Sequence, residues 1–294
     1  MNQETKARNM KIIQEMTIMD DIFMAVFFEN RPECAEEVLA AILPFKPTVE
    51  SVHTHYHYTS ANGHEVIFDI FAKDENNKTF NIEIQKRSDG ATPKRARFYS
   101  SMLDTISLKR GEQSEDIDDT YVIFITKYDI FKDNKPIYRI ERHINSKKRF
   151  NDGSHIIYLN TSYSGKSTKA IKNLIHDLKC SKPDEIINKN IAERFHQIKS
   201  GSAKEEVDSM CELLDTVMDK ERAKWLKEGR AEGIAEGRAE GIAEGRAEGI
   251  AKGIAENSRE IAKNMLLSGK LTVELIAEFC NLTVEEVNAL KPLA

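Results

Sequence analysis

The sequence predicts an α/β domain in which helices flank a mixed β-sheet, followed by a helical C-terminal extension. Three observations predict this fold class. First, apolar residues at helical spacing precede three runs of branched and aromatic residues. Second, a predicted helix and a further apolar run follow these three runs. Third, a tandem repeat occupies a later part of the chain. With 294 residues, the chain exceeds the usual size of one compact domain. We expect a main domain over residues 1–200, a helical segment with the repeats over 201–256, and a small helical hairpin over 257–294.

The composition restricts the class of protein. Hydrophobic residues make up 40% of the chain, yet no apolar run approaches the ~20 residues of a membrane helix. The first residues are polar, so no signal peptide and no membrane association are expected, and the sequence predicts a cytoplasmic protein. The four scattered cysteines are expected to be reduced core thiols. Because the net charge is −5, any nucleic-acid contact must come from a local basic patch.

Two helices are expected between Thr17 and Leu43, with Pro32 opening the second. The next three apolar or alternating runs read as strands: Ser51–Ser60, Val66–Phe71 and Thr79–Lys86. The polar residues 73–78 have the composition of a turn, which makes the second and third strands a hairpin.

The rest of the domain alternates between helix and strand. Pro93 begins a helix that runs to about Lys109, and Tyr121–Thr126 is a fully apolar strand typical of a position buried on both faces. A further strand is expected at His155–Leu159, followed by helices from Lys166 to about Met218. This order completes a mixed α/β domain.

Three polar residues on the predicted hairpin carry the candidate chemistry. Glu83 and Gln85 project from the same face of an alternating strand. Asp69 lies in an apolar strand, where an unpaired carboxylate is costly. If the hairpin pairs residues whose numbers sum to 152, Asp69 lies opposite Glu83 with Cβ atoms about 5 Å apart.

Two facing carboxylates repel each other unless a cation lies between them. Magnesium, or another divalent cation such as Mn²⁺, suits a few carboxylates with retained waters and phosphate oxygens. Such an ion lowers the pKa of bound water and polarises a phosphodiester. We therefore predict metal-dependent phosphodiester hydrolysis, with Asp69, Glu83 and Gln85 as catalytic residues.

Several segments together resemble the PD-(D/E)XK nuclease superfamily and, within it, the Rpn family of recombination-promoting nucleases and transposases. The matching segments are Thr17–Phe23, Asp69, Glu83–Gln85, Pro93–Tyr99, Tyr121–Ile125, Gly153–Asn160 and the Gly-Arg-Ala-Glu repeat. The resemblance implies a restriction-endonuclease-like core, DNA as substrate and breaks that promote recombination. Nothing in the sequence shows strand transfer.

The resemblance also assigns roles to residues. It implies that Asp69 and Glu83 hold the metal, and that Asp21 is similar to an upstream acidic position that joins the site. Gln85 stands where the superfamily more often has lysine. Glutamine hydrogen-bonds a water or a phosphate oxygen but brings no charge to the transition state, so some rate is lost or another cation serves.

A basic segment near the site is the candidate DNA interface. Arg95 and Tyr99, one helical turn apart, are placed to approach a phosphate. Lys94, Arg97 and Lys86 add positive charge, although Lys86 points to the opposite strand face unless the strand contains a bulge. The alternative is that this patch is simply a solvated surface.

Three histidines, His53, His55 and His57, fall on one face of a predicted strand. Two such imidazoles can bind a transition metal. Nothing nearby completes a site, so an exposed edge strand is the preferred interpretation.

From Glu228 to Glu256 glycine recurs every fourth residue in the repeat Glu-Gly-Arg-Ala-Glu-Gly-Ile-Ala. Each glycine costs a helix about 1 kcal/mol relative to alanine, so a lone helix is marginal. Packing against a partner helix offsets that cost and predicts a homo-oligomer, whereas the alternative is a flexible spacer.

The last segment predicts two helices around Asn281, with Thr283 and Glu286 as a capping box. Their spacing is similar to a helix-turn-helix, but Glu285 and Glu286 suit a phosphate-lined groove poorly. Protein contact is the preferred interpretation.

Two function classes follow. The first is a Mg²⁺-dependent DNA endonuclease. The second is a catalytically weak or inactive DNA-binding scaffold assembled through its repeat tail, which is consistent with glutamine at position 85.

Overall fold

The computed structural model describes residues 3–60, 62–145 and 147–291. The chain divides into two compact units, Met1–Met218 and Asp219–Ala294. One long helix, α7 (Lys204–Ser268), contributes to both units, which are described separately.

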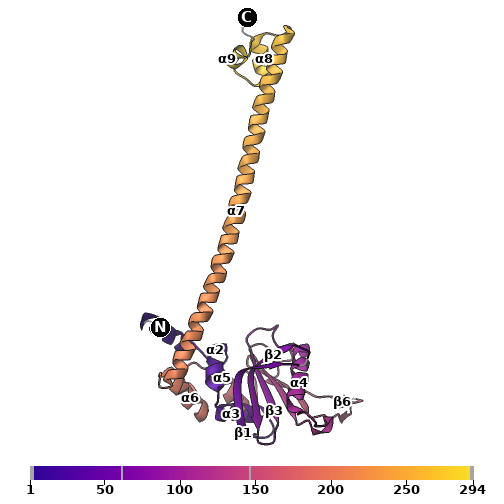
Figure 1. The fold of residues 1–294 in the computed structure, drawn as a ribbon, viewed down its shortest axis with the longest axis vertical. Coiled ribbons are helices and arrows are strands. Elements are labelled where there is room, and N and C mark those ends of the chain that lie inside the picture. Colours follow the sequence, from indigo (N-terminus) through magenta and orange to yellow (C-terminus); the bar gives the residue numbers. More distant parts are fainter. Residues whose placement is uncertain (1–2, 61, 146, 292–294) are drawn as a thin grey trace. The chain divides into compact units, whose positions relative to one another are not determined.

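A mixed sheet forms the centre of the first unit. In its described part, six strands lie in the order β1-β2-β3-β4-β8-β5. Figure 1 shows this sheet with α4 beside it. Their bounds are β1 (Val49–Thr59), β2 (Glu65–Asp74), β3 (Thr79–Gln85), β4 (Thr120–Thr126), β8 (Ser154–Asn160) and β5 (Ile137–Ile140). The β1, β2 and β3 pairings are antiparallel, β3, β4 and β8 run parallel, and β5 pairs antiparallel with β8.

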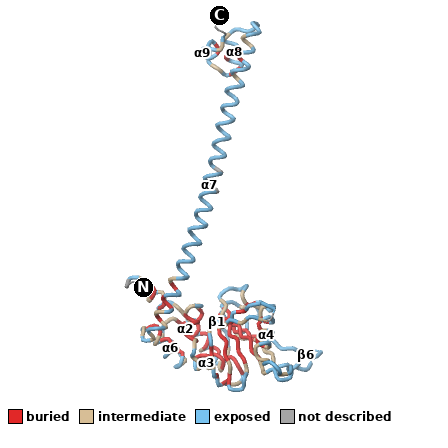
Figure 2. Tube along the Cα trace, in the orientation of Figure 1, coloured by how far each residue is buried: buried red, intermediate tan, exposed pale blue. Residues whose placement is uncertain are grey.

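Helices cover both faces of this sheet. The larger core lies under α1 (Gln3–Glu15), α2 (Asp21–Phe28), α3 (Pro32–Ile42), α5 (Lys169–Lys179), α6 (Lys189–Lys199) and the first turns of α7. The other face packs against α4 (Pro93–Ser107) through an aromatic cluster that includes Phe68, Tyr99 and Phe124. Every residue of β4 is buried, because successive side chains enter the two cores in turn. Figure 2 shows that buried residues are concentrated in the sheet and in the helices α2 and α3.

The predicted fold class is confirmed, and so are the two opening helices, the β2–β3 hairpin and the buried strand β4. Two features were not predicted. One is the edge strand β5, and the other is a second, two-stranded sheet of β6 (His143–Ile144) and β7 (Lys148–Arg149). These strands span only two to four residues, too few for an alternating pattern to stand out. Two short 3₁₀ turns, Ser114–Asp116 and Pro183–Glu185, complete the unit.

The cysteines and the hydropathy behave as expected. All four cysteines are free and buried: Cys34, Cys180, Cys211 and Cys280. Across the described residues, the helices are too short or too polar for any of them to cross a membrane.

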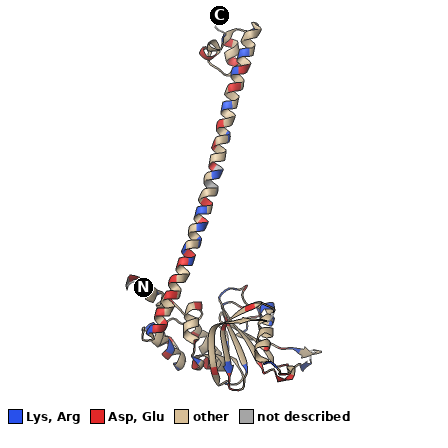
Figure 3. Ribbon diagram, in the orientation of Figure 1, with Lys and Arg blue, Asp and Glu red and all other residues tan. Residues whose placement is uncertain are grey.

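In the second unit, the repeat of residues 228–256 is helical throughout as part of α7. Its described side chains are exposed, and charges of both signs follow one another along the helix (Figure 3). Two short helices, α8 (Val273–Cys280) and α9 (Val284–Ala289), pack with the end of α7 around a small core. The predicted capping box of Thr283 and Glu286 is present.

Candidate active site

The sheet forks at Asp69 and Glu83. The β2–β3 ladder pairs Ile70 with Ile82, and the numbers of its four residue pairs all sum to 152, which is the register that the predicted site requires. The pairing between β2 and β3 ends with Ile70 and Ile82, one residue before Asp69 and Glu83 would face each other. Beyond this point β2 continues to pair with β1, and β3 continues with β4. The two carboxylates therefore occupy the point where one sheet divides into two branches.

Each of these carboxylates accepts a hydrogen bond from a backbone N–H group at the position where the β2–β3 pairing stops. The Asp69 N–H donates to Glu83 Oε1 at 3.2 Å, and the Ile84 N–H donates to Asp69 Oδ2 at 2.9 Å. Backbone groups that would have paired strand to strand are thus satisfied by side chains. This exchange places both side chains inside the fork.

Glu83 is fully buried, which corrects the expectation of an open site on a strand face. That face of β3 carries α4, and the relative exposure of Glu83 is 0%. Arg95 of α4 pairs with Glu83 Oε2 at 3.1 Å, and it also donates to Tyr99 Oη at 2.7 Å and to the Gly90 carbonyl at 2.9 Å. The alternation of β3 revealed which residues share a face, but not that a helix covers that face.

Burial dominates the electrostatics of the pair. It raises the pKa of Glu83, and the nearby Asp69 charge raises it further, while Arg95 opposes both effects. Burial also raises the pKa of Asp69, against the hydrogen bond from Ile84. One guanidinium, which of the two carboxylates is bonded to Glu83 alone, thus lies near both in a low-dielectric setting, so positive charge does not balance the two carboxylates.

The start of α4 fixes Arg95. Thr92 caps the helix by accepting from the Arg95 N–H, and Pro93 occupies the first turn. The guanidinium lies 4.9 Å from the centre of the Tyr99 ring, one turn later. The predicted pair of Arg95 and Tyr99 is therefore together, but it is directed at Glu83.

Acidic residues at the start of α2 lie beside the fork. Asp21 pairs with His55 Nε2 at 3.2 Å, and this hydrogen bond lowers the pKa of Asp21. The negative charge of Asp21 contributes, after burial, to the raised pKa of Asp69. Lys86 follows the end of β3 and forms an ion pair with Asp20, on the α2 side of the sheet. This is the face opposite Glu83, as the strand pattern indicated for Lys86.

Gln85 ends β3, where its side chain lies against Gly90. A Cβ atom on Gly90 would come within 2.0 Å of Gln85 Oε1. Among the described residues, no hydrogen bond to the Gln85 side chain is formed. Its amide is available to a water or a phosphate oxygen.

Two predicted DNA-contacting residues, Lys94 and Arg97, are exposed on the outer surface of α4. Arg87 beside them forms an ion pair with Asp89 at 2.8 Å, which removes part of the local positive charge. The basic surface next to the site thus consists mainly of Lys94 and Arg97.

The side chains at the fork have the chemical groups that bind a hydrated divalent cation. Carboxylates are the ligands that Mg²⁺ prefers. Asn81, fully buried two residues before Glu83 on the same strand face, lowers the pKa of that carboxyl through its side chain, but neither of its side-chain polar atoms has a hydrogen bond of normal geometry. The hydrogen-bonding capacity of the Asn81 side chain is therefore available to water molecules bound to an ion. Within the described residues, no three His, Cys, Asp or Glu side chains are already arranged around one point, since the oxygens face N–H groups and Arg95.

Sequence reasoning missed two features of this site. Asn81 went unnoticed, although its polar side chain continues the alternation through Glu83 and Gln85. The ion pair of Arg95 with Glu83 was also missed, since it joins residues 12 positions apart on different elements.

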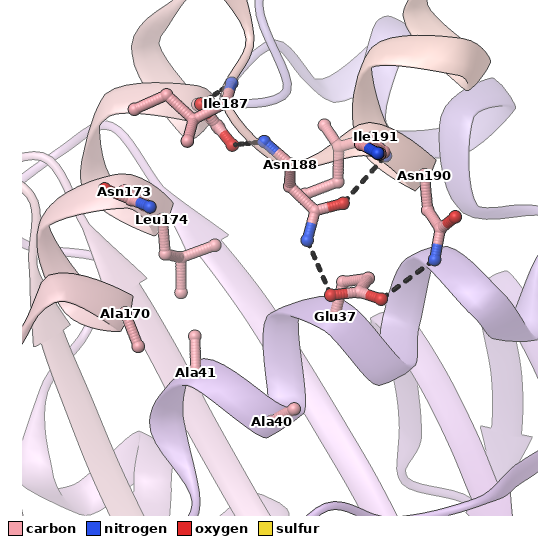
Figure 4. A pocket seen from close by; sticks show the side chains of 12 residues that line it. Glu37, Ala40, Ala41, Ala170, Asn173, Leu174, Ile187, Asn188, Asn190 and Ile191 are labelled. Carbon is pink, nitrogen blue, oxygen red and sulfur yellow. Dashed lines mark hydrogen bonds between the residues drawn. The ribbon is translucent and has the colours of Figure 1, made fainter.

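A pocket of about 560 Å³ lies elsewhere, between α3, α5 and α6 (Figure 4). Glu37 accepts there from Asn188 at 2.5 Å and from Asn190 at 2.8 Å, above a floor of Ala40, Ala41 and Leu174. The pocket contains none of the predicted site residues, and the Glu37 oxygens already have partners.

A mixed sheet flanked by helices, with a carboxylate pair at the end of a hairpin, is consistent with the PD-(D/E)XK nuclease fold. The family model for the PD-(D/E)XK nuclease family transposase matches residues 33–235, and the chain belongs to this family. The match includes Asp69, Glu83, Gln85 and Arg95 but begins after Asp21. No curated protein and no solved structure matches the chain.

Proposed function

We propose that this protein is a divalent-metal-dependent DNA endonuclease whose breaks promote recombination. The observation that carries the proposal is the carboxylate pair in the fork, Asp69 and Glu83, buried with too little positive charge. Membership of a nuclease family supports phosphodiester cleavage and a DNA substrate.

The proposed roles follow from position. Asp69 and Glu83, with Asp21, hold Mg²⁺ or Mn²⁺, which when bound supplies a water of lowered pKa and polarises the phosphodiester. Arg95 releases Glu83 and turns its guanidinium to a phosphate oxygen, and Tyr99 holds it in place. The Gln85 amide orients a water or phosphate oxygen.

The charged surface of α4 positions the DNA. Lys94 and Arg97 are exposed and contact the backbone, and Lys86 contributes from the other side of β3. Because the net charge is −5, binding depends on this local surface and weakens with salt.

Nicking of supercoiled plasmid tests the proposal. Wild-type protein is assayed with Mg²⁺, Mn²⁺ or EDTA beside Asp69→Asn and Glu83→Gln, which keep an acceptor oxygen for the N–H groups in the fork. We expect a loss on the order of 10²-fold or more in each variant. Glu65→Gln, an exposed carboxylate on the same strand as Asp69, is the matched control and keeps full activity.

Two outcomes contradict the proposal. One is the absence of metal-dependent cleavage, and the other is cleavage that persists in both site variants. Salt-sensitive DNA binding without cleavage supports the scaffold alternative, in which Gln85 marks a site without catalytic power.

We also propose that the chain self-associates through its repeat, with catalysis in residues 1–200, the repeat segment in 201–256 and a protein-contacting hairpin in 257–294. The repeat isoleucines Ile234, Ile242, Ile250 and Ile254 are 55–71% exposed. The repeat glycines have open space around them, which allows a second helix to approach closely.

Light scattering tests self-association. Deletion of residues 229–252, three copies of the repeat, is expected to reduce the molar mass to that of a monomer. An unchanged mass contradicts self-association through the repeat and leaves the nuclease proposal unaffected.

A further inference from the structure

One residue of β1 breaks the regularity of its strand beside the fork. The β1–β2 ladder pairs Thr54 with Ile70 and Tyr56 with Phe68, but the intervening pair, His55 and Asp69, is absent from it. His55 has φ +47° and is, within the described residues, the one residue of any strand with a positive φ. The residue opposite Asp69 is therefore held in a backbone conformation that non-glycine residues rarely adopt.

The irregularity changes the direction of the side chain. Thr54 Oγ1 donates to the Ala25 carbonyl on α2, and His55 also turns toward α2, whereas Tyr56 stacks on Phe71 on the other face. Two successive side chains thus point to one side, although the β1–β2 register is the same before and after His55. A regular strand would have directed the imidazole away from α2.

The three histidines of β1 form an internal comparison. His53 lies 3.6 Å from Glu29, and His57 lies 2.8 Å from Glu65, two carboxylates outside the fork. His55 alone of the three faces Asp21, one of the proposed metal ligands, and it lies opposite a second, Asp69. Of the three histidines, the one with the strained backbone, His55, is therefore the one that lies beside the proposed metal ligands.

The separation of His55 and Asp21 fits shared coordination. Two neighbouring ligands of an octahedral ion, each about 2.1 Å from it, lie about 3 Å apart. His55 Nε2 and Asp21 Oδ1 are 3.2 Å apart, and the His55 side chain is 42% exposed, so an ion can enter. An imidazole nitrogen among carboxylates favours Mn²⁺ and other transition metals over Mg²⁺.

We propose that His55 is a ligand of the divalent cation, together with Asp21 and Asp69, and that it biases the site toward Mn²⁺. This inference rests on the proposed metal-dependent function. It adds a nitrogen donor to a set otherwise composed of carboxylates, and it gives the strained backbone at His55 a role.

The test measures metal binding directly on the full chain. Asparagine tolerates a positive φ, so His55→Asn removes the imidazole without changing the backbone requirement. Calorimetry with Mn²⁺ and with Mg²⁺ is expected to show a loss on the order of 10-fold or more in Mn²⁺ affinity and little change for Mg²⁺. His57→Asn, on the same strand, is the control and binds both ions like the wild type.

A spectroscopic measurement separates a ligand from a structural residue. Pulsed electron paramagnetic resonance of the Mn²⁺-loaded protein is expected to show coupling to an imidazole nitrogen. The coupling should be lost in His55→Asn and retained in His57→Asn. Metal binding without nitrogen coupling in the wild type, or equal Mn²⁺ affinity in wild type and His55→Asn, overturns the inference but not the nuclease. Failure of the wild type to bind either ion overturns both.

Discussion

The fork of the sheet and the repeat helix use charged residues in opposite ways. At the fork, Glu83 is fully buried and depends on Arg95 as its charged partner. In the repeat, the described side chains are exposed, and an ion pair such as Lys252 with Glu248 leaves both groups more than 70% exposed. The protonation and the pairing of a charged group in the fork depend on the side chains packed around it. In the repeat, the position of a charged group follows from the period of the sequence, and water surrounds the group.

The largest effect expected from this difference is on the partner of Glu83. Arg95→Met leaves a buried carboxylate unpaired and should lower the free energy of unfolding by about 2 kcal/mol, less than the 3–5 kcal/mol of fully buried pairs because Glu83 can take up a proton. Adding Glu83→Gln should restore most of the stability. Urea denaturation at pH 7 measures both. A double variant no more stable than Arg95→Met would show that Arg95 acts through packing instead.

A smaller effect concerns pH. The pKa of Glu83 is raised in the folded chain, so the folded state binds a proton more readily than the unfolded state. Stability therefore falls as the pH rises from the ordinary pKa of glutamate toward the raised value. Glu83→Gln removes this loss of stability. At pH 8 we expect the variant to be more stable than wild type by about 1 kcal/mol, which raises its melting temperature by about 2–4 °C. At pH 4 the variant and wild type should melt at the same temperature. Calorimetry at both pH values checks this, and a variant that melts lower at pH 8 contradicts it.

A comparable but local effect is expected in the repeat. Gly241 has nothing within 4 Å of the position that a Cβ would occupy. In chains diluted until they are monomeric, Gly241→Ala should therefore raise the local free energy of opening by up to about 1 kcal/mol, as helix propensity predicts. In the self-associated chain, the added methyl group would instead meet the partner helix. Hydrogen exchange of the repeat amides measures it. Gly90→Ala at the fork is the contrast, since its Cβ would displace the Gln85 side chain. Equal protection in Gly241→Ala and wild type would mean that a partner helix fills the space.

The smallest effect is expected for the exposed ion pair. Lys252→Met breaks the contact with Glu248, 3.8 Å away on the same helix, and should change stability by less than about 0.5 kcal/mol. Hydrogen exchange of the same amides provides the readout. A change as large as that of Arg95→Met would remove the distinction between the two regions.

Local chemistry explains how much of the fold could be predicted. The turn composition of residues 73–78 and the alternation of β3 were enough to predict the hairpin. The register that brings Asp69 toward Glu83 entered the prediction as a condition, and the structure meets it over four residue pairs. Both depend on neighbours in the sequence. The apolar run of β4 likewise predicted a strand buried on both faces.

The rest of the site depends on contacts that the sequence does not display. The burial of Glu83 requires α4 to cross its face, and the pairing with Arg95 depends on where that helix begins. The left-handed conformation of His55 is unexpected for a histidine in an alternating run, and it occurs beside the point where β2 and β3 stop pairing. Tertiary packing decides each of these features.

The uninterrupted path of α7 through the repeat has a consequence for the length of this helix. Eight residues correspond to 24 nucleotides, so the gene can gain or lose one copy without a change of reading frame. Each copy adds about 12 Å of helix and turns its surface by about 80°. Because the described side chains of the repeat contact no core, such a change leaves the packed residues on either side intact. The number of copies therefore sets the length of this helix.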